Sequence, residues 1–217
     1  MKVRQKQVLG SLLLVCFVGL AVSVSGHMTW LQSMDRSVSH MVAKMVGPFN
    51  TMILKGVAVL GSPAVVIGLT ALLCVVLWIK RNAVISLWFG AVQLVGAAVA
   101  DMIKQVIARP RPVHQLVADT GFSFPSGHTF CTTILVLTLL TLVIPLVKGQ
   151  EARLLIKFAG ILWIVLVALS RVYLRDHFFS DVLASVLLAT GYWLLITSFE
   201  KPLTGVLRRV LPERSRA

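Results

Sequence analysis

The sequence predicts an all-α integral membrane protein, a bundle of six transmembrane helices with one short amphipathic helix at the membrane surface. Hydrophobic residues make up 57% of the 217-residue chain and charged residues only 13%, which is unusual for a soluble domain. Six stretches are long and apolar enough to cross the ~30 Å hydrocarbon layer as helices. The net charge of +13 therefore points to anionic lipid and membrane topology, and not to nucleic acid.

The expected spans cover residues 8–25, 57–79, 84–106, 129–147, 154–174 and 179–199. Basic residues precede the first span, so a cleaved signal peptide is an alternative to an anchor. The apolar run is long for a signal peptide, and we expect an uncleaved anchor. Lysine and arginine are more frequent in the segments on the N-terminal side of the membrane, which predicts a multi-pass plasma membrane protein with both termini in the cytoplasm. The whole chain, residues 1–217, is expected to form one membrane domain.

Residues 30–46 follow a different pattern. Apolar side chains recur there every three or four residues, with Asp35, Arg36 and Lys44 among the polar residues between them. This pattern predicts an amphipathic helix that is too short and polar to span the membrane, so we expect it in the outer interface. Two interpretations stay open, a lid that guides a lipid entering from the side and a passive connector, of which the connector is favoured.

The cysteines and carboxylates give no sign of a metal or redox centre. Cys16, Cys74 and Cys131 lie in apolar runs without metal-site spacing and are expected to be buried thiols. The few carboxylates near the segments described next form no convincing cage for a hard cation. We therefore expect no cofactor and metal-independent chemistry.

The first chemical segment, residues 104–112, follows the third span. Lys104 is expected on the last helical turn, and Pro110 and Pro112 restrict the backbone around Arg109 and Arg111. This arrangement fixes cations at a defined spacing, which suits a polyanion such as phosphate. A basic flank that binds headgroups is the simpler interpretation, but positive charge is disfavoured on this outer side.

The second segment, residues 123–129, precedes the fourth span. Ser126 is expected to cap the helix and Gly127 to allow close approach of the backbone. The free N–H groups and the positive end of the helix would form an anion site, with His128 able to donate a proton. A plain capped helix start is the alternative.

The third segment, residues 170–181, places His177 and Asp181 four residues apart at the start of the sixth span. On one helical face, the carboxylate could accept one ring N–H and leave the other nitrogen as a nucleophile. Arg171 offers a forked donor to phosphate oxygens. A structural His–Asp hydrogen bond is the alternative for such a pair taken alone.

The predicted topology brings all three segments to the extracytoplasmic face. Together they supply cations, backbone donors and two histidines, a set that suits phosphate monoester or anhydride chemistry. We expect His177 to attack phosphorus and His128 to protonate the leaving oxygen and later activate water. The expected catalytic residues are His177, His128 and Asp181, and the expected phosphate-binding residues are Lys104, Arg111, Ser126, Gly127 and Arg171.

The three segments resemble the signature of the type 2 phosphatidic acid phosphatase superfamily. Residues 104–112 match Lys, six residues, Arg-Pro; residues 125–128 match Pro-Ser-Gly-His; and residues 170–181 match Ser-Arg, five residues, His, three residues, Asp. The resemblance implies the same residue roles and a lipid phosphate substrate, such as phosphatidylglycerophosphate, undecaprenyl pyrophosphate, phosphatidic acid or diacylglycerol pyrophosphate. We expect the membrane and a lipid phosphate as partners, with no nucleic acid and no obligate protein partner.

Two other functions stay open. The phosphohistidine could pass its phosphate to another lipid or sugar, which would make the protein a phosphotransferase. A lipid carrier or small transporter is disfavoured, because charge in the middle of a span and paired broken helices are not evident in the sequence.

Overall fold

The computed structural model describes residues 1–210, with side chains described for residues 1–205. This part of the chain is helical and contains no strand. The helices are α1 Val3–Ser25, α2 Thr29–Ala43, α3 Pro48–Leu60, α4 Pro63–Lys80, α5 Ala83–Ile107, α6 Gly127–Val143 with the 3₁₀ turn η1 Ile144–Leu146, α7 Gln150–Tyr173, α8 Phe179–Ser198 and α9 Glu200–Val210. Residues 211–217 of the expected single domain lie outside the described residues.

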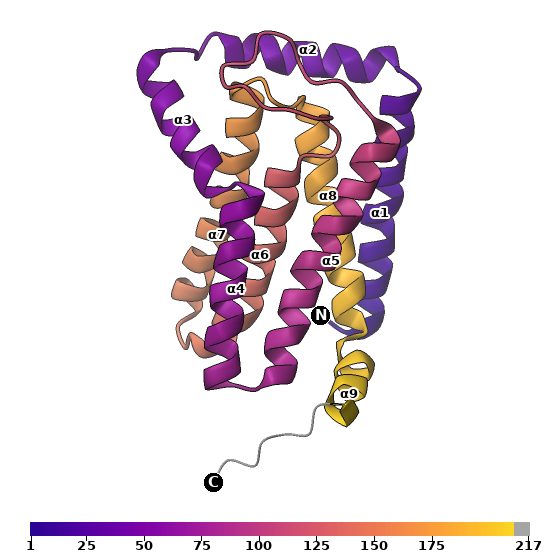
Figure 1. Cartoon of the computed structure of the whole chain (residues 1–217), viewed down its shortest axis with the longest axis vertical. Helices are drawn as coiled ribbons and strands as arrows, with labels where there is room; N and C mark the ends of the chain where they lie inside the picture. Colours follow the sequence, from indigo (N-terminus) through magenta and orange to yellow (C-terminus); the bar gives the residue numbers. More distant parts are fainter. Residues whose placement is uncertain (211–217) are drawn as a thin grey trace.

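Six helices of the described part are long and apolar enough to cross a membrane, namely α1, α4, α5, α6 together with η1, α7 and α8. They run side by side, and α2 lies across one end of the bundle (Figure 1). The predicted fold class is thereby confirmed. Many large apolar side chains on the outside of the bundle are exposed, among them Leu12, Val76 and Phe158, as expected for a surface that meets lipid.

The expected second span, residues 57–79, is misplaced at its start. The helix α3 ends at Leu60, and α4 begins at Pro63 after a break at residues 61 and 62. The Ser62 hydroxyl accepts the N–H of Val65, and proline is favoured at the first position of a new helix. Because α3 is itself apolar, hydropathy alone merged its last turn with α4. The separate α3 is inclined to the bundle and reaches the level of α2 (Figure 1).

Close packing places the outer helix α1 against α8, the helix that follows the third chemical segment. A Cβ atom on Gly10 would lie 3.1 Å from the carbonyl oxygen of Gly191. Glycine at both positions lets the two backbones approach, which is how membrane helices commonly pack. This contact joins the N-terminal helix to the bundle that carries the candidate site.

The helix α6 lies among its neighbours and buries several polar side chains. Two of its buried threonines satisfy their hydroxyls within the helix: Thr133 donates to the carbonyl of Thr129 at 2.7 Å and Thr138 to that of Ile134 at 2.9 Å. Cys131 on α6 is buried, but Cys16 is exposed on α1. Cys74 is half-buried. The expectation of three buried thiols is thus wrong for Cys16 and only partly met by Cys74, because an apolar residue of a spanning helix can face lipid as well as the core.

Candidate active site

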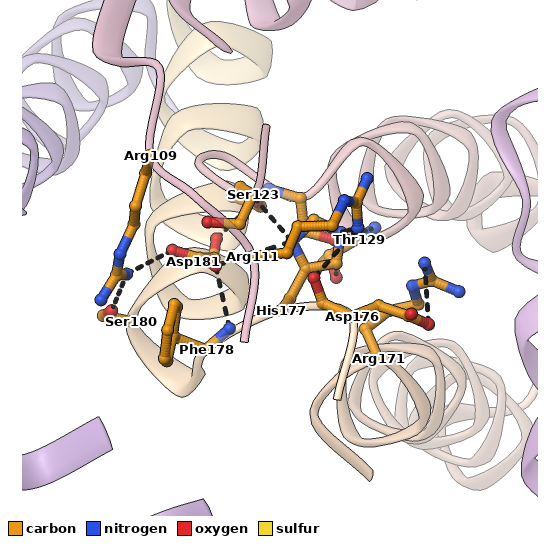
Figure 2. A network of polar contacts seen from close by, with 12 residues as sticks. Arg109, Arg111, Ser123, Thr129, Arg171, Asp176, His177, Phe178, Ser180 and Asp181 are labelled. Carbon is orange, nitrogen blue, oxygen red and sulfur yellow. Dashed lines mark hydrogen bonds and ion pairs between the residues drawn. The ribbon is translucent and has the colours of Figure 1, made fainter. Parts of the chain in front are cut away.

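The three chemical segments meet at the end of the bundle that α2 covers. Both α5 and α7 are followed by a residue with left-handed backbone, Ala108 (φ 48°) and Arg175 (φ 60°). After α7, the N–H groups of Asp176 and His177 donate to the carbonyl of Arg171 at 3.1 and 3.2 Å, which closes the turn into α8. The long loop from α5 to α6 crosses the same end, so residues from all three segments lie within one polar network (Figure 2).

His177 lies at the centre of this network and is only 2% exposed. Its Nδ1 lies 2.6 Å from the carbonyl oxygen of Ser123, whereas Asp181 Oδ2 is 3.6 Å away. The expected Asp181 carboxylate is therefore adjacent, but the hydrogen bond that sets the tautomer goes to a backbone carbonyl. With Nδ1 carrying the proton, Nε2 is left as a base, 3.4 Å from Arg111 Nη1.

Ser123 owes its position to the arginine–proline segment. Its N–H donates to the carbonyl of Arg109 at 2.8 Å, and its hydroxyl donates to that of Pro110 at 3.1 Å. The first and third segments are thus joined through Ser123, and a shift of the proline segment would move the acceptor of the His177 proton.

The protonation state of His177 suits the role of a nucleophile. Burial lowers the pKa of His177 to about 4, against the opposing effect of the Asp181 carboxylate, and the positive charges of Arg171 and Arg111 lower it further. The imidazole is therefore neutral near pH 7, with the Nε2 lone pair available.

Arg111 and Arg171 share one anion in the structure, the carboxylate of Asp119. Asp119 Oδ2 lies 3.0 Å from Arg111 Nη1 and 2.6 Å from Arg171 Nη2. Burial alone would raise the pKa of Asp119, but the two guanidinium groups outweigh it and hold the pKa below its usual range. Two arginines on different segments are thus already arranged around a single oxyanion, as phosphate binding requires.

Lys104 and the start of α6 complete the cationic side. A Cβ atom on Gly127 would lie 4.0 Å from Lys104 Nζ, so the lysine reaches the first helical residue. Ser126 caps α6 as expected, since its hydroxyl accepts the N–H of Thr129 at 3.4 Å. Its own N–H donates to the Ser185 hydroxyl at 2.7 Å and is not free for a ligand. The helix geometry leaves the N–H groups of the next two residues available for an anion.

The two histidines line adjoining cavities. His128 lines a cavity of about 380 Å³ with Arg171, Asp119 and Asp176, and His177 lines one of about 400 Å³ with Arg111. The ion pair between Arg111 and Asp119 joins the two walls. Burial raises the pKa of Asp176 to about 6 despite Arg171 at 3.1 Å, so this carboxyl titrates near neutral pH.

Two residues of the site, Asp119 and Asp35, were not predicted from the sequence as site residues. Asp119 carries no positional signal, because it lies in an irregular loop. Asp35 did carry a positional signal. Together with Leu31, Val38 and Val42 it follows the spacing of four, three and four residues that places side chains on one face of a helix. Asp35 is 2% exposed on that inward face, so it is not one of the solvent-facing polar residues of α2.

A family model described as the PAP2 superfamily matches residues 85–204, more than half of the chain. The chain belongs to the PAP2 superfamily. It is accordingly a membrane-embedded phosphoric ester hydrolase, and the matched region contains all three segments.

Individual PAP2 relatives extend the match over most of the chain. Phosphatidylglycerophosphatase B of Bacillus subtilis (strain 168) is 28% identical over 197 residues, which are 87% of this chain and 93% of that protein. A crystal structure of a transmembrane PAP2 type phosphatidylglycerolphosphate phosphatase from Bacillus subtilis superimposes with a TM-score of 0.78 at 25% identity, covering 89% of this chain and 96% of the other. LpxE of Aquifex aeolicus shares the fold, with a TM-score of 0.55 at 23% identity over 75% of this chain and 93% of that one.

Proposed function

We propose that this PAP2 enzyme hydrolyses phosphatidylglycerophosphate to phosphatidylglycerol, undecaprenyl pyrophosphate to undecaprenyl phosphate, or both. The observation that carries the proposal is the pair Arg111 and Arg171 around one carboxylate, next to a buried, neutral His177. Likeness to a relative named phosphatidylglycerophosphatase B supports the first substrate. An outward-facing site would favour the second, because that lipid is released on the outer face.

The proposed reaction is a double displacement. The Nε2 lone pair of His177 attacks phosphorus and the bond from phosphorus to the lipid oxygen breaks. His128, which gains its proton when the negatively charged phosphate binds beside it, gives that proton to the lipid oxygen. Neutral His128 then takes a proton from water, the water oxygen attacks phosphorus, and the bond from phosphorus to Nε2 breaks. Asp181 would stabilise the positive charge that develops on the His177 ring.

In this proposal arginine and lysine charge takes the part that a metal ion plays in other phosphoryl transfer enzymes. Arg111, Arg171 and Lys104 come from three different elements and would contact the oxygens that gain charge. The described residues include no group of three His, Cys, Asp or Glu side chains placed to hold a metal ion. If arginine and lysine charge takes this part, the catalytic set works in the presence of a chelator.

We further propose that the site faces the extracytoplasmic side and that both termini are cytoplasmic. The site and α2 lie at one end of the bundle, and α9 lies at the opposite end (Figure 1). The larger number of basic residues in the segments on the α9 side supports this orientation.

The substrate proposal is tested with purified enzyme and a panel of lipid phosphates in detergent, with chelator present. Release of inorganic phosphate without any added acceptor is expected, with the two proposed lipids giving the highest kcat/KM. The variant His177→Gln measures the background. Loss of all activity with chelator would contradict the metal-free reaction, and phosphate release only on addition of an acceptor lipid or sugar would identify a phosphotransferase.

Removing the proton donor should trap the covalent intermediate. In His128→Ala, an activated phosphate ester with a good leaving group can still phosphorylate His177, but no group is left to activate water. We expect a phosphoenzyme that is stable to base and labile to acid, with mass spectrometry placing the phosphate on residue 177. Phosphate on any other residue would overturn the assignment of the nucleophile.

Asp119 is expected to compete with the substrate. Its carboxylate occupies both arginines and stays ionised because its pKa is held low, so a substrate phosphate must displace it. For Asp119→Asn we expect KM to fall several-fold, about 1 kcal/mol in binding, with kcat within a few-fold of wild type. The exposed Asp101→Asn is the matched control for removal of one carboxylate. A rise in KM would show instead that Asp119 organises the arginines for the substrate.

A further inference from the structure

Asp35 is a buried carboxylate on the helix that crosses the end of the bundle. Its Oδ1 accepts the N–H of Ser180 at 2.9 Å, and its Oδ2 accepts the Ser180 hydroxyl at 2.7 Å. Ser180 lies in the first turn of α8, one residue before Asp181. A carboxylate at this place satisfies an N–H that has no acceptor within the helix, so α2 is fastened directly to the start of the helix that carries Asp181.

Arg109 lies between two buried carboxylates. Its Nη2 donates to Asp35 Oδ2 at 2.8 Å, and its Nη1 donates to Asp181 Oδ1 at 2.5 Å. The guanidinium carbon also lies 4.0 Å from the centre of the Phe178 ring. Because the guanidinium is planar and holds a carboxylate at each of two nitrogens, its position fixes that of both carboxylates.

Asp181 reaches the nucleophile with its other oxygen. Asp181 Oδ2 accepts the N–H of Phe178 at 2.9 Å and lies 3.6 Å from Nδ1 of His177. A continuous chain of contacts therefore runs from Asp35 through Arg109 and Asp181 to His177. Figure 2 labels Arg109, Asp181 and His177 of this chain. Since Asp181 is fully buried, its charge would be costly without Arg109.

We propose that Asp35 and Arg109 are positioning residues that orient Asp181 and set its charge toward His177. The helix α2 is then a working part of the enzyme and not a passive connector. This inference rests on the proposed roles of His177 and Asp181. Asp35 limits how strongly Arg109 neutralises Asp181, and Arg109 keeps Asp181 ionised and aligned.

The test uses Asp35→Asn, Arg109→Lys and Arg109→Gln in the purified full-length enzyme. Loss of an outer partner that orients a metal ligand typically costs about 10–100-fold. By analogy, we expect kcat to fall by about tenfold in Asp35→Asn and by up to about 100-fold in Arg109→Gln, with partial recovery in Arg109→Lys. KM should stay within about twofold, because the phosphate-binding arginines are unchanged. Arg36→Gln, an exposed position on the same helix, is the matched control and should keep wild-type kcat.

Two further readouts separate positioning from simple support of the fold. If Asp35 acts through Arg109, Asp35→Asn should cost no further activity in the Arg109→Gln background. The acid limb of kcat/KM should also shift in opposite directions, to higher pH in Arg109→Gln and to lower pH in Asp35→Asn, because removal of a positive charge favours a proton on His177 and removal of a negative charge disfavours it. The other charged or titratable groups near His177 stay the same in both variants. They are Asp181, Asp176, Arg111, Arg171 and His128 of the polar network, and His40, His114 and Arg175, which line the same cavity as His177.

The outcomes distinguish this inference from the proposed function. Wild-type phosphate release that depends on His177, combined with wild-type kcat in Asp35→Asn and Arg109→Lys, would overturn the inference and leave the function standing. Full activity in His177→Gln would overturn the proposed function itself. Lower kcat that only follows a lower melting temperature, with additive losses and an unshifted pH profile, would also overturn the positioning role. Asparagine can still accept the Ser180 N–H, so Asp35→Asn is expected to fold.

Discussion

Replacing His177 with glutamine is expected to lower kcat by at least about 10⁴-fold, as removal of a nucleophile does in other enzymes with covalent intermediates. Glutamine fills a similar volume and can donate its amide N–H to the Ser123 carbonyl, which accepts the ring proton in the wild type at 2.6 Å. It has no nitrogen lone pair with which to attack phosphorus. KM should stay within a few-fold of wild type, because Arg111 and Arg171 still hold the phosphate.

The measurement is steady-state phosphate release together with phosphoenzyme labelling. His40 is an exposed histidine on α2 that lines the same cavity as His177 but has no part in the proposed reaction. His40→Gln is therefore the matched control and should keep its activity and label. Because burial lowers the pKa of His177 to about 4, the nucleophile is neutral from about pH 5 upward, so the deficit should be the same at about pH 5.5 and about pH 7.5. A labelled His177→Gln enzyme would contradict the covalent role.

The fold was largely predictable because the bilayer imposes a simple rule on sequence. Each spanning helix must be an apolar run of about 20 residues, and the six runs were visible. The break between α3 and α4 was not predicted, although Gly61, Ser62 and Pro63 carry ordinary signals of a helix end and a helix start. The position of this break depends on packing. A Cβ atom on Gly61 would lie 2.7 Å from Val167 Cγ1, so the turn packs closely against α7. No pattern in a single sequence reveals such a contact.

The candidate site was predictable at the level of side chains and less so at the level of contacts. Fixed spacing near helix ends indicated which residues would gather. The acceptor of the His177 proton is a backbone carbonyl, and a carbonyl leaves no mark on the residue type at position 123. Likewise, the N–H of Ser126 is taken by Ser185, a helix residue far along the chain, so the donors at the α6 start had to be read from the structure.

The burial of Asp35 was also not predicted from the sequence. A carboxylate in an amphipathic helix was assumed to face water because that is the usual case. Asp35 lies on the apolar face instead, since Arg109 pairs with it across the loop. A charge on the inner face of an interfacial helix is costly unless paired, so its position on that face was itself the signal of a partner.

Replacing Asp181 with asparagine is expected to lower kcat by about 10²-fold, less than in enzymes where the carboxylate alone fixes the histidine tautomer. Here Ser123 fixes the tautomer, so what the variant loses is charge. A full charge about 4 Å from the ring that becomes positive is worth about 4 kcal/mol at an effective dielectric constant near 20, or about 10³-fold. Arg109 already neutralises part of that charge, which places the expected effect at the lower value.

The amide oxygen introduced by Asp181→Asn can still accept the Phe178 N–H that the carboxylate Oδ2 accepts at 2.9 Å, so the start of α8 should persist. The check is kcat with a natural lipid and with an activated ester. The deficit should be present in both, because His177 gains positive charge in the first step whatever the leaving group. Activity within a few-fold of wild type would remove Asp181 from the proposed mechanism. A loss of about 10⁴-fold, as in enzymes whose carboxylate sets the tautomer, would mean that Asp181 takes over the Nδ1 proton from Ser123 when substrate binds.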